Sequence, residues 1–103
     1  MSNDYDLDAV RRFFGGDQKK RDLHWRCGGF AKTVIQDERF VEIISDLKQR
    51  FKDPAFSASA SPAYREDLFR KYQAVCDIEQ ELKNMAHGYE ALVFERQNEN
   101  EED

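Results

Sequence analysis

Glycine, proline and cysteine are all scarce in this chain of 103 residues, which contains five, two and two of them respectively. So few glycines and prolines do not supply the turns that a sandwich or barrel of many short strands requires. Charged residues make up 36 % of the sequence, a share that suits long helices with one solvated side. We therefore expect an all-α protein. At this length we expect one domain with a thin core, since small domains bury a low fraction of their surface.

Long apolar runs are also missing, and the two cysteines are too few for a disulfide framework. No stretch approaches the roughly 20 apolar residues that span a bilayer. Asp4, Asp6 and Asp8 stand where a signal peptide would place basic and apolar residues. These absences predict a soluble, cytoplasmic protein with no membrane partner, in which Cys27 and Cys76 are free thiols.

Apolar residues recur at helical spacing in three segments of the chain. The first contains Leu7 and Phe13 and ends at Gly15, since glycine supplies the left-handed residue that closes a helix. The third opens at Ser61 and Pro62, which suit the N-cap and the first helical position. We predict helices over residues 5–14, 18–52 and 62–95, in one domain spanning 1–97, with an acidic disordered tail over 98–103.

The second and third helices are long and amphipathic, and a short polar loop joins them, so they should pack antiparallel. The second helix extends back to residue 18 because Leu23 and Cys27 are in phase with Phe30 and Val34 along one heptad seam. It ends before Pro54, because the residue preceding a proline is pushed out of the helical region. The predicted fold is an antiparallel long helical hairpin with a short N-terminal helix.

A hairpin folded near residue 57 sets an approximate register between the two helices. It places Cys27 beside His87 and Cys76 beside Glu38, so the thiols lie roughly 15 Å or more apart, too far to bridge. Gly28 begins a glycine pair inside the second helix, where each glycine costs roughly 1 kcal/mol relative to alanine. Such a pair marks a kink, a fraying point or a place where another backbone comes close.

The apolar stripes on both long helices are wider than a two-stranded seam requires. We expect the N-terminal helix and a second copy of the chain to cover the excess, so the protein should be a dimer or higher oligomer. The residues themselves therefore predict a non-enzymatic helical interaction protein that self-associates and binds a protein partner. Aromatic anchors carry much of the energy of such contacts. The predicted interface residues are Phe30, Val34, Phe40, Phe51, Phe69, Tyr72 and Tyr89.

The net charge of −5 does not favour DNA or anionic membranes as partners. The segment between the glycine pairs Gly15-Gly16 and Gly28-Gly29 is nevertheless basic. Its cations can neutralise phosphates while Trp25 stacks on a base, so a small nucleic-acid-binding regulator is the alternative function. The hairpin register also sets this segment beside the acidic C-terminal residues, which explains the charge layout without a ligand. The candidate nucleic-acid contacts are Lys19, Lys20, Arg21 and Arg26.

His24, Cys27 and His87 are the residues to weigh as a metal site, with Glu90 as a fourth ligand. No CxxC or HxxxH spacing accompanies them, so ordinary partly buried side chains are the simpler interpretation and we predict no metal. The sequence order reveals no Ser-His-Asp or Cys-His arrangement. The glycine pairs do not form a phosphate loop, because no strand precedes them. We predict no enzyme and no cofactor.

The pairing of DERFVEIISDLKQRF with SPAYREDLFRKYQAVCDIEQELKNMAHGYEAL resembles small helical-hairpin proteins encoded by tailed bacteriophages. The likeness covers residues 30–94 and lies in a short charged chain with one loop and a regular last helix with an acidic end. It carries no functional residue over to this sequence. It implies an accessory or assembly role, in the host cytoplasm or in the virion.

Overall fold

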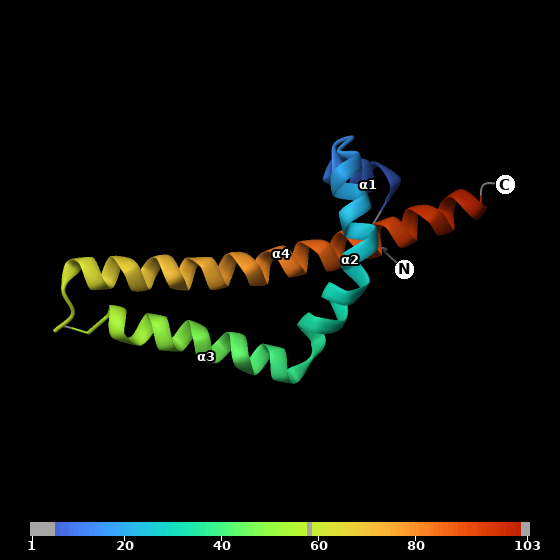
Figure 1. Cartoon of the computed structure of the whole chain (residues 1–103). Helices are drawn as coiled ribbons and strands as arrows, with labels where there is room; N and C mark the ends of the chain where they lie inside the picture. The colour runs from blue at the N-terminus through green and yellow to red at the C-terminus, as the bar shows by residue number, and fades with distance from the viewer. Residues whose placement is uncertain (1–5, 58, 102–103) are drawn as a thin grey trace. The chain divides into compact units, whose positions relative to one another are not determined.

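The computed structural model describes residues 6–57 and 59–101, and the chain in these ranges is all-α, as predicted. α4 packs against α2 and α3, which gives the predicted helical hairpin (Figure 1). No helix among these residues is both long and apolar enough to cross a membrane. The four helices are α1 (Leu7–Phe14), α2 (Gln18–Gln36), α3 (Glu38–Ala55) and α4 (Pro62–Glu101).

Short-range hydrogen bonds explain where α1 and α2 begin and end. The Asp6 carboxylate caps α1 by accepting a hydrogen bond from the Ala9 N–H at 2.6 Å. Gly15 closes α1 with a φ of 57°, and its N–H donates to the Arg11 carbonyl at 2.8 Å. Asp17 then accepts a hydrogen bond from the Lys20 N–H at 3.0 Å, so α2 starts after a connection of only three residues.

The single helix predicted over 18–52 is wrong, because α2 and α3 are separate helices divided at Asp37. Asp37 has an extended backbone, and its side chain accepts a hydrogen bond from the Arg39 N–H at 2.9 Å. A short acidic side chain competes for backbone donors in this way and so favours a cap over a helix interior. Hydrogen bonds from Arg39 lower the pKa of the Asp37 carboxyl to about 2.

The other helix ends also differ from the prediction. Pro54 lies inside the last turn of α3, which ends at Ala55, and the Phe56 N–H closes that turn by donating to the Asp53 and Lys52 carbonyls. α4 begins at Pro62 as predicted but runs to Glu101. Residues 98–101 are therefore helical rather than a disordered tail, and the Asn98 side chain donates a hydrogen bond to the Phe94 carbonyl one turn earlier at 2.8 Å. Residues 102–103 lie outside the described residues.

The chain was predicted to be a single domain. Within it, two compact units share α4. Residues 1–33 and 82–103 form one of them, called here the crossing unit, which contains α1, most of α2 and the second half of α4. Residues 34–81 form the other, called here the hairpin unit, which contains α3 and the first half of α4.

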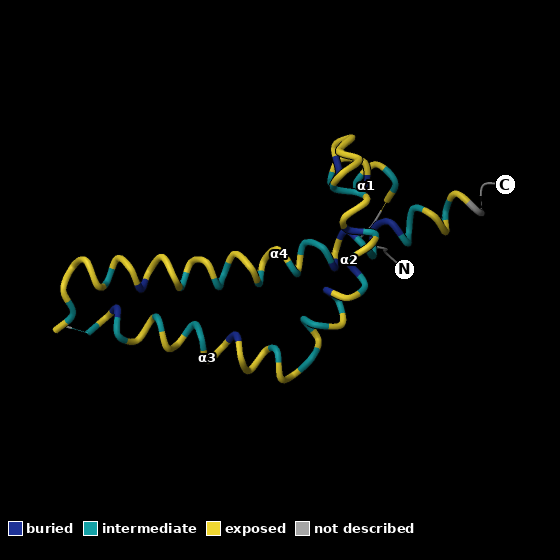
Figure 2. Tube along the Cα trace, in the orientation of Figure 1, coloured by how far each residue is buried: buried dark blue, intermediate teal, exposed yellow. Residues whose placement is uncertain are grey.

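The crossing unit contains a core built where α1 and α2 pack on α4. Val10 and Phe14 of α1 are 1 % and 2 % exposed, and they cluster with Ala91 and Leu92 of α4. Figure 2 shows buried positions concentrated in this part of the chain. The N-terminal helix therefore folds onto its own chain here, as one of the two predicted covers for the apolar stripes.

The hairpin unit contains a much thinner core. Within its described residues, the hydrophobic side chains that count as buried are Ile44, Ala55 and Leu68. An ion pair between Lys48 and Glu79 joins α3 to α4 and raises the pKa of Lys48. A pair of helical segments that buries so little apolar surface is marginal by itself.

Candidate functional surfaces

Two glycines allow α2 and α4 to come into close contact in the crossing unit. A Cβ atom on Gly28 would lie 2.3 Å from the Tyr89 Cβ and 2.5 Å from the Met85 carbonyl oxygen. A Cβ on Gly88 would lie 2.0 Å from the His24 Nδ1 atom. Gly28 is therefore needed for a close backbone approach, which was one of the three readings of the glycine pair.

His24, Cys27 and His87 lie in the same unit, and the two histidine rings both pack against Phe13. The His24 ring is 2 % exposed, and its centroid is 5.9 Å from that of Phe13. The His87 centroid is 5.0 Å from the same Phe13 ring. No group of three or more metal-ligating side chains is found in the part of the chain that the structure describes. The Glu90 carboxylate instead pairs with Lys32 at 2.8 Å.

The fold uses much of the basic segment internally. The Lys20 Nζ donates a hydrogen bond to the Phe13 carbonyl at 2.8 Å and lies 4.1 Å from the Phe13 ring centroid. Arg21 donates two hydrogen bonds to Glu95, and these two side chains are only 22 % and 15 % exposed. Contact between the basic segment and the acidic C-terminal residues is thus present at this pair, as the register predicted.

Trp25 packs between α4 side chains, which limits its use as a stacking platform. Its ring centroid is 5.5 Å from that of Tyr89, and the Arg96 guanidinium lies 3.6 Å from the Trp25 ring centroid. A cavity of about 220 Å³ opens beside it. Arg21 and Glu95 are among the charged residues that line this cavity, and they are already paired with each other. Of the four candidate nucleic-acid contacts, only Lys19 and Arg26 are exposed, and neither forms an ion pair with another described residue.

The α2 seam turns away from α4, contrary to the predicted register. This seam consists of Leu23, Cys27 and Phe30; Leu23 is 36 % and Phe30 72 % exposed, and Cys27 is a half-buried free thiol. The side of α2 that contacts α4 instead contains His24 and Gly28, both buried. Because Gly28 has no side chain, α2 approaches α4 more closely on this side. The helices therefore pack through the side with His24 and Gly28 and not through the more apolar seam.

The predicted interface residues are split between the two units and differ widely in exposure. Phe30 and Phe69 are exposed, at 72 % and 43 %. Phe69 makes an edge-on contact with Phe56, with 5.5 Å between the ring centroids. Tyr89 belongs to the helix crossing through its contacts with Trp25 and the glycines. The other predicted members, Val34, Phe40, Phe51 and Tyr72, are half-buried.

The hairpin unit also exposes apolar side chains that were not among the predicted interface residues. Ile43 of α3 is 59 % exposed and Ile78 of α4 is 58 % exposed. Both belong to the apolar stripes recognised in the sequence. The excess width of those stripes was the signal that some of their members would face outward. Which members do so depends on the side that each helix turns to the other.

Helix geometry places Ile43 and Ile78 on one side of the hairpin unit. Ile44 of α3 and Leu68 of α4 are buried and mark the side that each helix turns to the other. At 100° per residue, Ile43 is rotated about 100° from Ile44 and Ile78 about 80° from Leu68, both in the same sense, and Lys48 and Cys76 are rotated in the opposite sense. Rotations in the same sense fall on the same side of an antiparallel helix pair. The ion pair between Lys48 and Glu79 also corrects the predicted register, which placed Cys76 beside Glu38.

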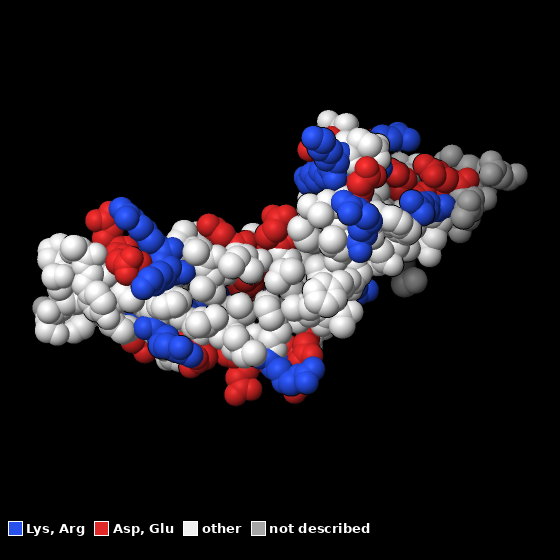
Figure 3. Space-filling view, in the orientation of Figure 1, with Lys and Arg blue, Asp and Glu red and all other residues white. Residues whose placement is uncertain are grey.

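The isoleucine face is the name used here for the side opposite Lys48 and Cys76. In one view of the hairpin unit, Figure 3 shows a broad band of uncharged side chains over α3 and the first half of α4, with charged side chains at its margins. The face is apolar but small. Its members are Ile43 and Leu47 of α3 with Val75 and Ile78 of α4.

Comparison with known proteins adds no family assignment to this geometry. The chain matches no protein-family model, no curated protein and no solved structure.

Proposed function

We propose that this protein is a non-enzymatic helical interaction protein that self-associates through the isoleucine face. The observation that carries the proposal is the imbalance within the hairpin unit. That unit buries few hydrophobic side chains, yet Ile43 and Ile78 remain 59 % and 58 % exposed. Small units with too little core are commonly stabilised by association with another chain.

The size of the effect is appropriate for a dimer contact. Full burial of an isoleucine side chain contributes about 1.5–3 kcal/mol. Ile43 and Ile78 are each more than half exposed, so covering them contributes on the order of 1 kcal/mol per side chain. A two-fold contact counts each of them twice, since the same patch is buried on both copies.

The charges beside the isoleucine face suit a second copy of the chain. Arg50 follows Ile43 by two helical turns, and Lys71 precedes Ile78 by two turns, so both border the face. Arg50 pairs with Asp46, and Lys71 pairs with Asp67 at 3.1 Å. These pairs neutralise the two cations beside the face, so neither cation would repel an identical surface.

The wider setting of this proposal comes from the sequence. The resemblance to phage helical-hairpin proteins supports an accessory or assembly role. The two free thiols are in keeping with a cytoplasmic location.

Self-association is tested by light scattering coupled to size-exclusion chromatography over a concentration series. We expect the wild-type protein to be a dimer or higher oligomer, and Ile43→Glu or Ile78→Glu to weaken association by about tenfold or more, because each buries a charge in the contact. Val41→Glu is the matched control. Val41 is 53 % exposed on the same helix but lies two turns from Lys48, on the other side of the unit.

Two results would contradict the proposal. One is a wild-type protein that remains monomeric at every concentration. The other is a Val41→Glu variant that dissociates as readily as Ile43→Glu, which would mean that the contact does not lie on the isoleucine face.

A further inference from the structure

The α2 seam has the spacing of a coiled-coil seam and no partner helix among the described residues of the crossing unit. Leu23, Cys27 and Phe30 follow one another in steps of four and three, as alternating core positions of a heptad do. His24 and Gly28, which contact α4, lie about 100° further around the helix. The crossing against α4 therefore fixes α2 while the seam stays outside that contact, and Phe30 is the most exposed large hydrophobic residue among the described residues of this unit.

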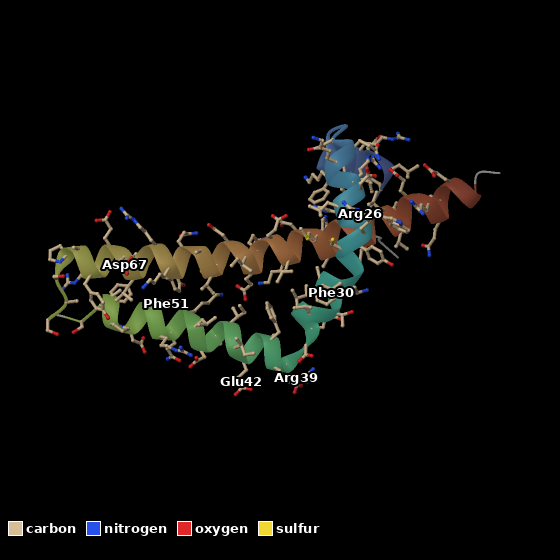
Figure 4. All side chains as sticks on the ribbon, viewed as in Figure 1. Arg26, Phe30, Arg39, Glu42, Phe51 and Asp67 are labelled. Atoms are coloured by element: carbon tan, nitrogen blue, oxygen red, sulfur yellow. The ribbon has the colours of Figure 1, made fainter. Side chains whose placement is uncertain are left out.

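Two cations without ion pairs flank this seam. Lys19 lies one turn before Leu23, and Arg26 lies one turn before Phe30. Neither has an ion pair with a described residue, whereas the neighbouring Arg21 is bound to Glu95. In the heptad, both cations occupy the same position beside the core. The charge at such flanking positions determines which partner helix is preferred. Arg26 and Phe30 can be followed along α2 in Figure 4.

We propose that the α2 seam binds an amphipathic helix of another protein whose flanking residues are acidic. The apolar side of that helix would cover Leu23, Cys27 and Phe30. Its carboxylates would meet Lys19 and Arg26. An apolar seam bordered by the cations Lys19 and Arg26 is the kind of surface that such a helix recognises.

The same charges argue against a second copy of α2 as the occupant. In a parallel pair, Arg26 would face the positions held by His24 and Ala31, which contain no acid and are buried on their own chain. In an antiparallel pair, Lys19 of one copy would face Arg26 of the other. Like charges so placed are unfavourable, so the seam selects a different chain.

A protein helix also fits the surface better than a nucleic acid. Leu23 and Phe30 occupy the centre of the seam, and Trp25, the natural stacking residue, is held between Tyr89 and Arg96. Among the described residues, two cations without ion pairs border the seam, Lys19 and Arg26. A phosphate backbone would be attracted to those cations and would leave the apolar centre uncovered.

The test uses fluorescein-labelled helical peptides of about three heptads with leucine at the core positions. One peptide has glutamate at the flanking positions and its matched partner has lysine there. Fluorescence anisotropy is read with the full chain at about 50 and 200 mM salt. We expect the acidic peptide to bind and the basic one not to, and we expect Phe30→Ser and Arg26→Glu each to weaken binding by about tenfold.

Matched substitutions in the hairpin unit serve as controls. Val41→Ser removes an apolar side chain of similar type, and Lys52→Glu reverses an exposed cation that has no ion pair with a described residue. Both should leave peptide affinity within about twofold of wild type. Ile43→Glu should also bind the peptide normally, which separates this seam from self-association. Circular dichroism confirms that each variant remains helical.

Three results would overturn the proposal. The first is no binding of the acidic peptide up to about 1 mM. The second is binding that Phe30→Ser leaves intact or that Ile43→Glu abolishes, since the peptide would then lie elsewhere. The third is preferential binding of a labelled single-stranded RNA that weakens steeply with salt and is lost in Arg26→Glu but not in Phe30→Ser.

Discussion

Gly28 and Gly29 are adjacent in α2, yet substitution by alanine should have opposite effects on stability at the two positions. Replacing either glycine by alanine in a helix interior stabilises the helix by about 1 kcal/mol. A Cβ on Gly29 would lie 3.6 Å from the nearest Tyr89 ring atom, which is ordinary van der Waals contact. Gly29→Ala should therefore raise the free energy of unfolding by about 0.5–1 kcal/mol.

Gly28→Ala introduces the same side chain at a position with no room for it. Its Cβ would lie 2.5 Å from the Met85 carbonyl oxygen and 2.3 Å from the Tyr89 Cβ, and neither atom can rotate away. α2 must then move away from α4 by about an ångström, and overpacking of this kind costs about 1–3 kcal/mol. Because a backbone atom is involved, we expect the upper end of that range. The net loss is then about 2 kcal/mol, and the two variants differ by about 3 kcal/mol.

Urea and thermal unfolding followed by circular dichroism at one fixed protein concentration measure this difference. A separation of about 3 kcal/mol corresponds to at least about 10 °C in Tm for a chain of this size. Fixed concentration is needed because association alters apparent stability. A Gly28→Ala variant as stable as Gly29→Ala would refute the close approach of α2 and α4.

Two further predictions concern charged side chains. Arg21→Met should lower the free energy of unfolding in urea by about 1–3 kcal/mol, because it leaves the partly buried Glu95 carboxylate without its partner. The control Arg70→Met removes an exposed ion pair and should change the free energy of unfolding by less than about 0.5 kcal/mol. Equal effects of the two substitutions would contradict this prediction. An NMR titration of the Asp37 carboxyl should give a pKa of about 2, because Arg39 lowers this pKa from 3.8. The Asp37 carboxylate therefore contributes fully to stability above about pH 4, and its contribution is lost as the pH falls towards 2. Arg39→Ala should return that pKa towards 3.8, and an unchanged value would show that Arg39 is not the cause.

Local signals in the sequence identified some helix ends well and others poorly. Gly15 closes α1 and Pro62 opens α4 as expected, because a left-handed glycine and a proline at the first position act on their own few residues. Asp37 was missed as a boundary because the apolar spacing continues on both sides of it. Asp37 followed by Glu38 is typical of a helix start, because aspartate caps helices and acidic residues are favoured in the first turn. This pair could have indicated the break.

The candidate surfaces were harder to predict than the helices. The seam of Leu23, Cys27 and Phe30 was recognised, but it was assigned to the contact with α4. The free cations at Lys19 and Arg26 could not be separated from Lys20 and Arg21 by sequence. Lys20 and Arg21 differ from Lys19 and Arg26 because they are bound by Phe13 and Glu95, which lie on other helices.

The sequence by itself determined that the chain is all-α, that its long last helix packs against the preceding helical segments, and that it has more apolar surface than two helices cover. These properties follow from periodicity and capping, which act over a few residues. Only the tertiary structure decided which side of each helix became the contact. At the crossing, Gly28 and Gly88 let two backbones approach, so the close contact forms there and the more apolar seam is left exposed. That choice depends on steric fit between residues about 60 positions apart, which no local pattern in the sequence records.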